Sequence, residues 1–130
     1  MQKLITLILS LGLLAAAPLT LQAGDWELLG SRKVGFRHDR DVIHVGADAG
    51  RFSKIQLRVR RAGVRFFDVR VHFGNGEVQD IPIRRFIPAG GETRVIDLHG
   101  GRRFIRKVVF HYKTRRAAPR RAVVKLWGRH

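Results

Sequence analysis

The chain has 130 residues, a formal net charge of +16 at pH 7 and no cysteine. The lack of cysteine excludes disulfides, thiol catalysis and thiolate metal sites, so packing and hydrogen bonds must stabilise the fold. After any leader is removed, a chain of this length forms one domain around one modest core.

The first residues have the pattern of a bacterial export signal. Lys3 and the amino terminus are positively charged, and Leu4–Ala17 forms an apolar run of 14 residues. Ala23 supplies the small residue that signal peptidase requires. We therefore predict a signal peptide at 1–23 and one mature domain at 24–130, periplasmic or secreted. An uncleaved anchor is the alternative, but the run is shorter than the roughly 18 residues of a membrane span. No later segment reaches that length, so we expect no span in the mature chain.

After the signal, apolar and polar residues alternate with period two, and no helical stripe is present. Ile55, Leu57 and Val59, for example, alternate with basic or polar residues. Turn-forming glycines and prolines separate the alternating segments. The predicted strands are 26–36, 41–45, 53–61, 67–73, a segment around 81–83, 93–98, 104–113 and 121–127. About eight short strands indicate an all-β fold, an antiparallel β-sandwich of jelly-roll or Ig-like type, with a partly open β-barrel as the alternative.

The turns between the middle strands suggest a first hairpin. A three-residue loop at 62–64 sets Val59 opposite Phe67, which keeps their apolar residues on one face. Arg58 then faces Asp68 on the outer side of the sheet, a favourable cross-strand pair.

A second predicted hairpin turns around Asn75. A two-residue turn would set an apolar residue against Asp80, so we favour a three-residue loop. That register pairs Val69 with Ile81, Phe67 with Ile83, and Arg70 with Asp80. Pro82 cannot donate to a ladder, which places its strand at a sheet edge or at a bulge. Trp26 and Trp127 lie near opposite ends of the domain, which suggests that the terminal strands are neighbours.

Residues suited to catalysis are sparse. Ser31 and Ser53 are the two serines that follow the signal, and neither lies in a G-x-S-x-G elbow, which argues against a serine hydrolase. The run His38–Asp41 offers metal ligands, but the interleaved Arg37 and Arg40 oppose a cation, so we favour a solvated loop. We predict a non-enzymatic protein with no catalytic residue, metal or cofactor. A weak hydrolase using paired carboxylates is an alternative.

Positive charge is concentrated towards the C-terminus. The segment 98–130 carries eleven basic residues and no acidic one, whereas 24–97 carries fourteen basic and ten acidic residues. We predict an anion-binding surface from the basic residues of the last third: Arg102, Arg103, Arg106, Lys107, Lys113, Arg115, Arg116, Arg120 and Arg121. If the last two strands are hairpin neighbours, Lys107 and Lys113 share a face that the loop between the strands extends. The planar guanidinium suits phosphate and carboxylate groups.

In the bacterial envelope the partners for such a surface are lipopolysaccharide, anionic phospholipid, acidic polysaccharide and extracellular DNA. We expect an exported protein that binds these anionic surfaces or polymers. One alternative is a solvated face in which the arginines reflect genome composition. Another is a protein or glycan interaction module, in which charge serves solubility and Phe66, Tyr112 and Trp127 cluster on one surface.

Several short segments together carry a family resemblance. They are Trp26–Gly30, Asp41–Gly46, Gly50–Phe52, Gly74–Glu77, Gly90–Leu98 and Leu126–Gly128. The series resembles a family of small exported proteobacterial proteins of unknown function, across essentially the whole mature domain. The resemblance implies a periplasmic or secreted all-β domain, and it brings no catalytic residue, cofactor or ligand.

Overall fold

The computed structural model describes residues 26–36, 40–115 and 120–130, and the predicted signal peptide lies outside them. These residues form β-strands and one short 3-10 helix, and they contain no α-helix. The strands are β1 (Trp26–Lys33), β2 (Arg40–His44), β3 (Arg51–Phe52), β4 (Lys54–Arg60), β5 (Val64–Phe73), β6 (Val78–Ile87), β7 (Ile96–Asp97), β8 (Arg103–Lys113) and β9 (Val123–Arg129). The 3-10 helix η1 (Ala47–Ala49) follows β2. No helix in the described part of the chain is long and apolar enough to cross a membrane.

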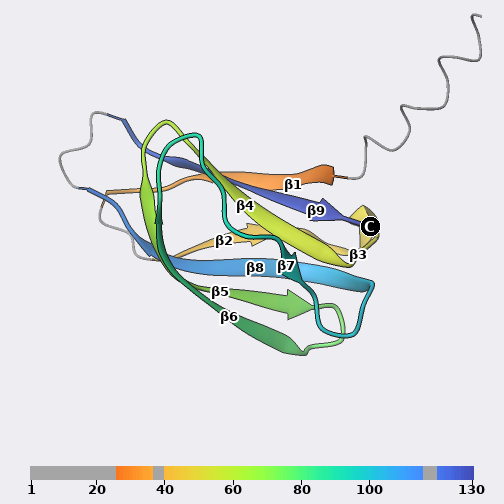
Figure 1. The fold of residues 1–130 in the computed structure, drawn as a ribbon. Helices are drawn as coiled ribbons and strands as arrows, with labels where there is room; N and C mark the ends of the chain where they lie inside the picture. Colours follow the sequence, from red (N-terminus) through yellow and green to blue (C-terminus); the bar gives the residue numbers. More distant parts are fainter. Residues whose placement is uncertain (1–25, 37–39, 116–119) are drawn as a thin grey trace, which may run out of the picture.

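The strands form two antiparallel sheets (Figure 1). The first, which we call sheet A, has the order β1-β9-β4-β7, and sheet B has the order β2-β8-β5-β6 with β3 also paired to β8. Sheet A lies over sheet B, and the two do not close into a barrel. The predicted β-sandwich is therefore confirmed.

The core lies between the sheets and follows the alternation seen in the sequence. Ile55, Leu57 and Val59 of β4 have no exposed surface and face sheet B, as predicted. Phe110 and Tyr112 of β8 are equally buried and meet them from the other side. Because facing sheets pack about 10 Å apart, each strand gives one side to this layer and leaves the other to solvent.

The predicted hairpin between β4 and β5 is wrong. β4 pairs with β9 and β7 in sheet A, whereas β5 pairs with β6 and β8 in sheet B. Arg58 therefore lies opposite Lys125, not opposite Asp68. The short loop that begins with Arg61, whose φ is +74°, carries the chain from one sheet to the other. A hairpin and such a crossing both keep the apolar residues facing the core, so alternation alone does not distinguish them.

The predicted β5–β6 hairpin is confirmed in its central register. Val69 lies opposite Ile81 and Arg70 opposite Asp80, with 3.6 Å between Arg70 Nε and Asp80 Oδ1. Pro82 was expected at a sheet edge or at a bulge. It lies in β6, the edge strand of sheet B, next to the irregularity in the β5–β6 pairing, so both conditions are met.

The same hairpin departs from prediction at Phe67. The register shifts between Phe66 and Asp68, so Phe67 and Ile83 are not aligned as a regular pair. Phe66 has no exposed surface, whereas the side chain of Phe67 is 43% exposed. Phe67 is the extra residue that β5 carries relative to β8. Because an extra residue shifts the alternation by one position, Phe66 faces the core and Phe67 faces solvent.

The terminal strands are neighbours, as the two tryptophans suggested. β1 pairs with β9 along its length and sets Leu28 opposite Trp127. The predicted strand 93–98 is reduced to β7, although the Thr93 amide still donates to the Leu57 carbonyl oxygen of β4 at 2.9 Å. The hydroxyl oxygen of Thr93 accepts a 3.1 Å hydrogen bond from the amide of Leu57.

A buried carboxylate joins the two sheets at the edge formed by β1 and β2. Asp41 is 8% exposed and accepts hydrogen bonds from the Tyr112 hydroxyl at 2.8 Å and from the Arg32 guanidinium at 3.2 Å. Arg32 belongs to sheet A, whereas Asp41 and Tyr112 belong to sheet B. Asp41 is therefore committed to the fold and is not a free ligand of the predicted metal run.

Replacement of Asp41 by alanine should destabilise the protein by about 2–3 kcal/mol, because the buried Tyr112 hydroxyl loses this acceptor. The free energy of unfolding from urea titration measures the effect. The control is Asp48→Ala in η1, an exposed position where the change should stay within about 0.5 kcal/mol. Equal urea midpoints for the two variants would contradict the role assigned to Asp41.

Candidate functional site

The predicted anion-binding residues do not form one patch. β8 and β9 belong to different sheets, so the hairpin that would unite them does not exist. Arg102 and Arg103 lie at the start of β8, whereas Lys113 ends that strand and Arg115 follows it. An eleven-residue strand separates its ends by about 33 Å. Arg116 lies outside the described residues.

Arg103 is held by contacts within the protein. Its guanidinium donates to Glu77 at 2.6 Å and to the carbonyl oxygen of His99 at 2.7 Å, and it lies 3.9 Å from the ring centre of Phe73. Hydrogen bonds from Asn75 and Arg103, with the positive charge of Arg103, hold the pKa of Glu77 below its ordinary value. We therefore assign Arg103 to the fold and not to a binding surface.

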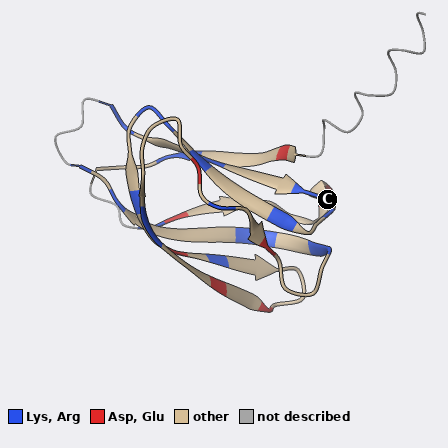
Figure 2. Ribbon diagram, viewed as in Figure 1, with Lys and Arg blue, Asp and Glu red and all other residues tan. Residues whose placement is uncertain are grey.

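A larger group of cations gathers at the opposite end of the sandwich, where β4 turns into β5. We call it the basic end, and all its members are exposed: Lys33, Arg60, Arg61, Arg65, Arg84, Arg85, Lys113, Arg115, Arg120 and Arg121. Strand pairing brings them together, since Arg65 lies opposite Lys113, and Lys33 and Arg60 both lie opposite Val123. Figure 2 shows the crowding of Lys and Arg around this end, with further basic segments along both sheets.

The basic end is not neutralised by nearby carboxylates. Among the described residues, none of its ten cations forms an ion pair. The acidic residues closest to it in the sheets are engaged elsewhere, Asp41 with Arg32 and Asp68 with His111. Away from this end, Lys54 pairs with Asp97, Arg103 with Glu77 and His130 with Glu27. The charge is thus polarised along the sandwich.

A pocket of about 310 Å³ opens into the basic end. Its lining is three cations, one hydroxyl and one aromatic ring: Arg65, Lys113, Arg115, Thr114 and Phe86. Phe86 is 46% exposed, and its ring lies 2.3 Å from where a Cβ of Gly63 would be. Glycine at position 63 is therefore what allows the ring to lie there and form the apolar side of the pocket.

The sequence prediction missed six of the ten cations of the basic end, among them Lys33 of β1. Arg60, Arg61, Arg65, Arg84 and Arg85 come from the part of the chain where acidic residues nearly balance the basic ones. The sequence feature that could have located these residues is the position of the dibasic pairs, which lie at or near the ends of β4 and β6 and just before β9. In a sandwich of alternating strand directions, these positions fall at the same end.

Phe66, Tyr112 and Trp127 do not form the exposed aromatic cluster that would have supported the alternative of an interaction module. Phe66 and Tyr112 have no exposed surface and belong to the core. The ring of Trp127 lies beneath the Arg58 guanidinium, 4.5 Å from its centre. The phenylalanines that do reach solvent include Phe67, which the alternation had placed on the core side, and Phe86, which the sequence pattern did not single out.

Only part of the run considered for metal binding is described by the structure. His38 and Asp39 lie outside the described residues, and Asp41 is buried in the contacts given above. Within the described ranges, no group of three or more His, Asp or Glu side chains is arranged to hold a metal ion.

Arg102 and Arg103 should differ sharply when replaced by alanine. Arg103→Ala removes the contacts to Glu77, His99 and Phe73 and should destabilise the protein by about 1–3 kcal/mol. Arg102→Ala, at an exposed neighbour, should change stability by less than about 0.5 kcal/mol. Thermal or urea unfolding measures both, and equal effects would contradict the assignment.

The same variants test the linkage of stability to pH. The pKa of Glu77 is lower in the folded state than in the unfolded state. The ionised Glu77 therefore stabilises the fold at pH values above its unfolded-state pKa, and this stabilisation is lost as the pH falls through its folded-state pKa. Arg103→Ala should therefore weaken this acid-dependent loss, whereas Arg102→Ala should leave it unchanged. Urea midpoints measured across the acidic range provide the comparison.

Comparison with known proteins identifies a family and no characterised relative. No curated protein and no solved structure matches the chain. A family model described as a domain of unknown function, DUF2541, matches residues 4–128, which is nearly the whole chain. The protein belongs to the DUF2541 family.

Proposed function

We propose that this protein is a non-enzymatic, exported component of the bacterial envelope that binds anionic surfaces or polymers through its basic end. The observation that carries the proposal is the collection of ten exposed Lys and Arg side chains at one end, without ion pairs among the described residues. Gathering like charges costs self-repulsion in the folded state. A bound polyanion relieves that repulsion and releases its own counterions.

The geometry of the basic end suits a partner with repeated negative groups. Its cations come from both sheets and from the loop before β9, so they are spread over the whole end. Most of them are arginines, whose guanidinium binds phosphate or carboxylate in a bidentate manner. The pocket beside Phe86 is at the small end of the range for ligand sites, so it would hold one anionic group of such a partner.

The envelope location rests on the amino-terminal pattern. Lys3, the apolar run Leu4–Ala17 and Ala23 favour export, and the resemblance to small exported proteobacterial proteins agrees with it. An exported basic domain meets lipopolysaccharide phosphates, anionic phospholipids, acidic polysaccharide and extracellular DNA. In this location the partners available to the basic end are envelope polymers, and not cytoplasmic nucleic acid.

Charge reversal at the basic end should weaken binding to lipopolysaccharide and to a short DNA duplex. The variant is Arg65→Glu with Arg115→Glu, and we expect a loss of affinity of more than about tenfold. The salt slope of log affinity, measured from roughly 50 to 200 mM, should fall by about one unit per lost phosphate contact. Fluorescence titration of the full chain measures both quantities.

The matched control reverses two exposed arginines away from the basic end, Arg51→Glu with Arg102→Glu, so both proteins carry the same net charge. It should retain affinity within about threefold, because its cations lie outside the binding surface. Equal losses in the two variants would show that only net charge matters. Binding that is absent, or that does not change with salt, would reject the function.

A further inference from the structure

The outer face of sheet B carries a second, separate group of cationic side chains. His44 of β2 and His72 of β5 both lie opposite Lys107 of β8, so the three residues form a row across three adjacent strands. Directly opposed residues have Cβ atoms about 5 Å apart and point to the same side of the sheet, so the row spans about 10 Å. The side chains flanking His44 along β2, Ile43 and Val45, lie on the core side.

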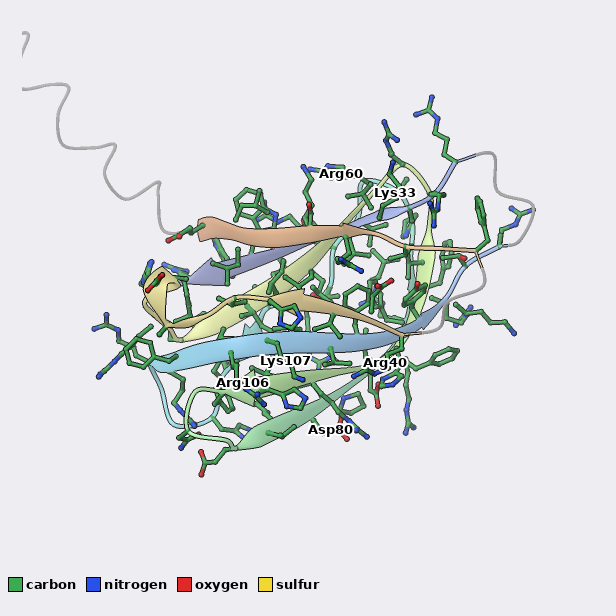
Figure 3. The ribbon with its side chains drawn as sticks, turned by 180° about the vertical axis from the view of Figure 1, so that it is seen from behind. Lys33, Arg40, Arg60, Asp80, Arg106 and Lys107 are labelled. Atoms are coloured by element: carbon green, nitrogen blue, oxygen red, sulfur yellow. The ribbon has the colours of Figure 1, made fainter. Side chains whose placement is uncertain are left out.

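A bulge in β8 doubles the positive charge of this row. The register shifts between His72 and Phe73, so β8 carries one extra residue between the buried Ile105 and Val108. Regular alternation would give one outward residue there, and the bulge gives two, Arg106 and Lys107. Figure 3 shows both side chains with Arg40 on the same face of sheet B, and Asp80 farther across on β6.

The carboxylates on this face are already paired. Asp80 lies 3.6 Å from Arg70, and Asp68 lies 2.7 Å from the Nδ1 atom of His111. Among the described residues, His44, His72 and Lys107 have no carboxylate partner. The described structure therefore supplies no carboxylate to balance the positive charge of Lys107 in this row.

The charges around His72 act against its protonation. Burial comes first, and the cations Lys107, Arg106, Arg70 and Arg40 add to it, so the pKa of His72 lies below its ordinary value. On the remaining side, β6 sets Val78 opposite His72 and offers Asp80, which is engaged by Arg70. His44 stands on the far side of Lys107. A bound anion would offset this field and let the His72 imidazole take up a proton.

We propose that His44, Lys107 and His72, with Arg106 beside them, form a site for one tetrahedral oxyanion of the phosphate class, and that binding is coupled to protonation of His72. The Lys107 ammonium donates to one oxygen at the centre of the row. Each imidazole donates an N–H to another oxygen from its own side. Three donors across about 10 Å match a group whose oxygen atoms point in several directions.

This site does not depend on the basic end. His72 lies seven positions after Arg65 of the basic-end pocket on β5, a distance of about 23 Å along the strand. Two surfaces this far apart are screened from each other at physiological salt, where the Debye length is about 8 Å. The oxyanion site is therefore testable even if the basic end binds no polymer.

Sulfate and inorganic phosphate are the probes, each titrated into the full chain while the histidine ring signals are followed by NMR. Sulfate remains a dianion between about pH 5.5 and pH 7.5, on either side of the ordinary histidine pKa of about 6.5, so any pH dependence comes from the protein. We expect its affinity to rise at least about fivefold at the lower pH, the size of one exposed ion pair gained. The signals of His44 and His72 should both move on addition of sulfate, and the pKa of His72 should rise.

The variants separate a built site from general attraction by a basic protein. Lys107→Gln should abolish the sulfate-dependent change of the His72 signal, whereas Lys125→Gln, on the outer face of sheet A, should leave it intact. His99, an exposed residue in the turn after β7, reports non-specific effects. The charge reversal at Arg65 and Arg115 should also leave sulfate binding intact.

Three outcomes would overturn the site. The first is sulfate affinity that does not change with pH, and the second is an equal response of His99 and His72. The third is a response that survives Lys107→Gln, even though thermal unfolding shows that variant to be folded. Acetate tests the ligand class, because a planar monoanion that binds as tightly as phosphate would contradict a tetrahedral site.

Discussion

Burial of one face of every strand is the constraint on which the rest of this structure depends. The chain has no cysteine, so the layer between the sheets must supply the stability that other small domains can take from disulfides. Leu57 and Leu126 from sheet A meet Phe66 and Phe110 from sheet B, all without exposed surface. With the inner faces committed to this layer, the charges of a strongly basic chain are confined to the outer faces and the ends of the sandwich.

The ends and the outer faces then acquire different electrostatic characters. At the end that carries Glu77 and Asp97, basic side chains find carboxylate partners close by. At the basic end the strands terminate in arginine and lysine. The nearby Asp41 and Asp68 are held by Arg32, Tyr112 and His111, and Glu92, opposite Arg58, forms no ion pair with the described cations. The described protein is therefore electrically polar along its strands, and an anionic partner would orient it.

The sequence predicted the elements better than their partners. Alternation located most strands and the inward residues Ile55, Leu57 and Val59, because burial of one face leaves a period of two in any sheet. The β5–β6 register could be derived from one turn and from the Arg70–Asp80 pair. The β4–β5 connection could not, because the pairing of β4 with β9 depends on contacts nearly seventy residues apart, which local patterns do not contain.

The candidate surfaces were harder to predict for the same reason. Arg102 and Arg103 are neighbours of Arg106 and Lys107 in the chain, yet Arg103 stabilises a turn while Arg106 and Lys107 face outward beside His72. Linear charge density located many of the cations but could not assign them to surfaces. Arg65 and Lys113 meet only because β5 and β8 are paired.

Bulges are the places where this fold departs from regular alternation, and both candidate surfaces lie near them. A regular strand presents every second residue, so two consecutive side chains cannot face the same side. The extra residue in β8 breaks this rule and brings Arg106 and Lys107 out together beside the two histidines. The shift at Phe67 and the positive φ of Arg84 have a related effect near the basic end, where Arg84, Arg85 and Phe86 are exposed in succession. The irregular positions of the sheet thus generate the concentrated charge, while the regular ones build the core that holds it in place.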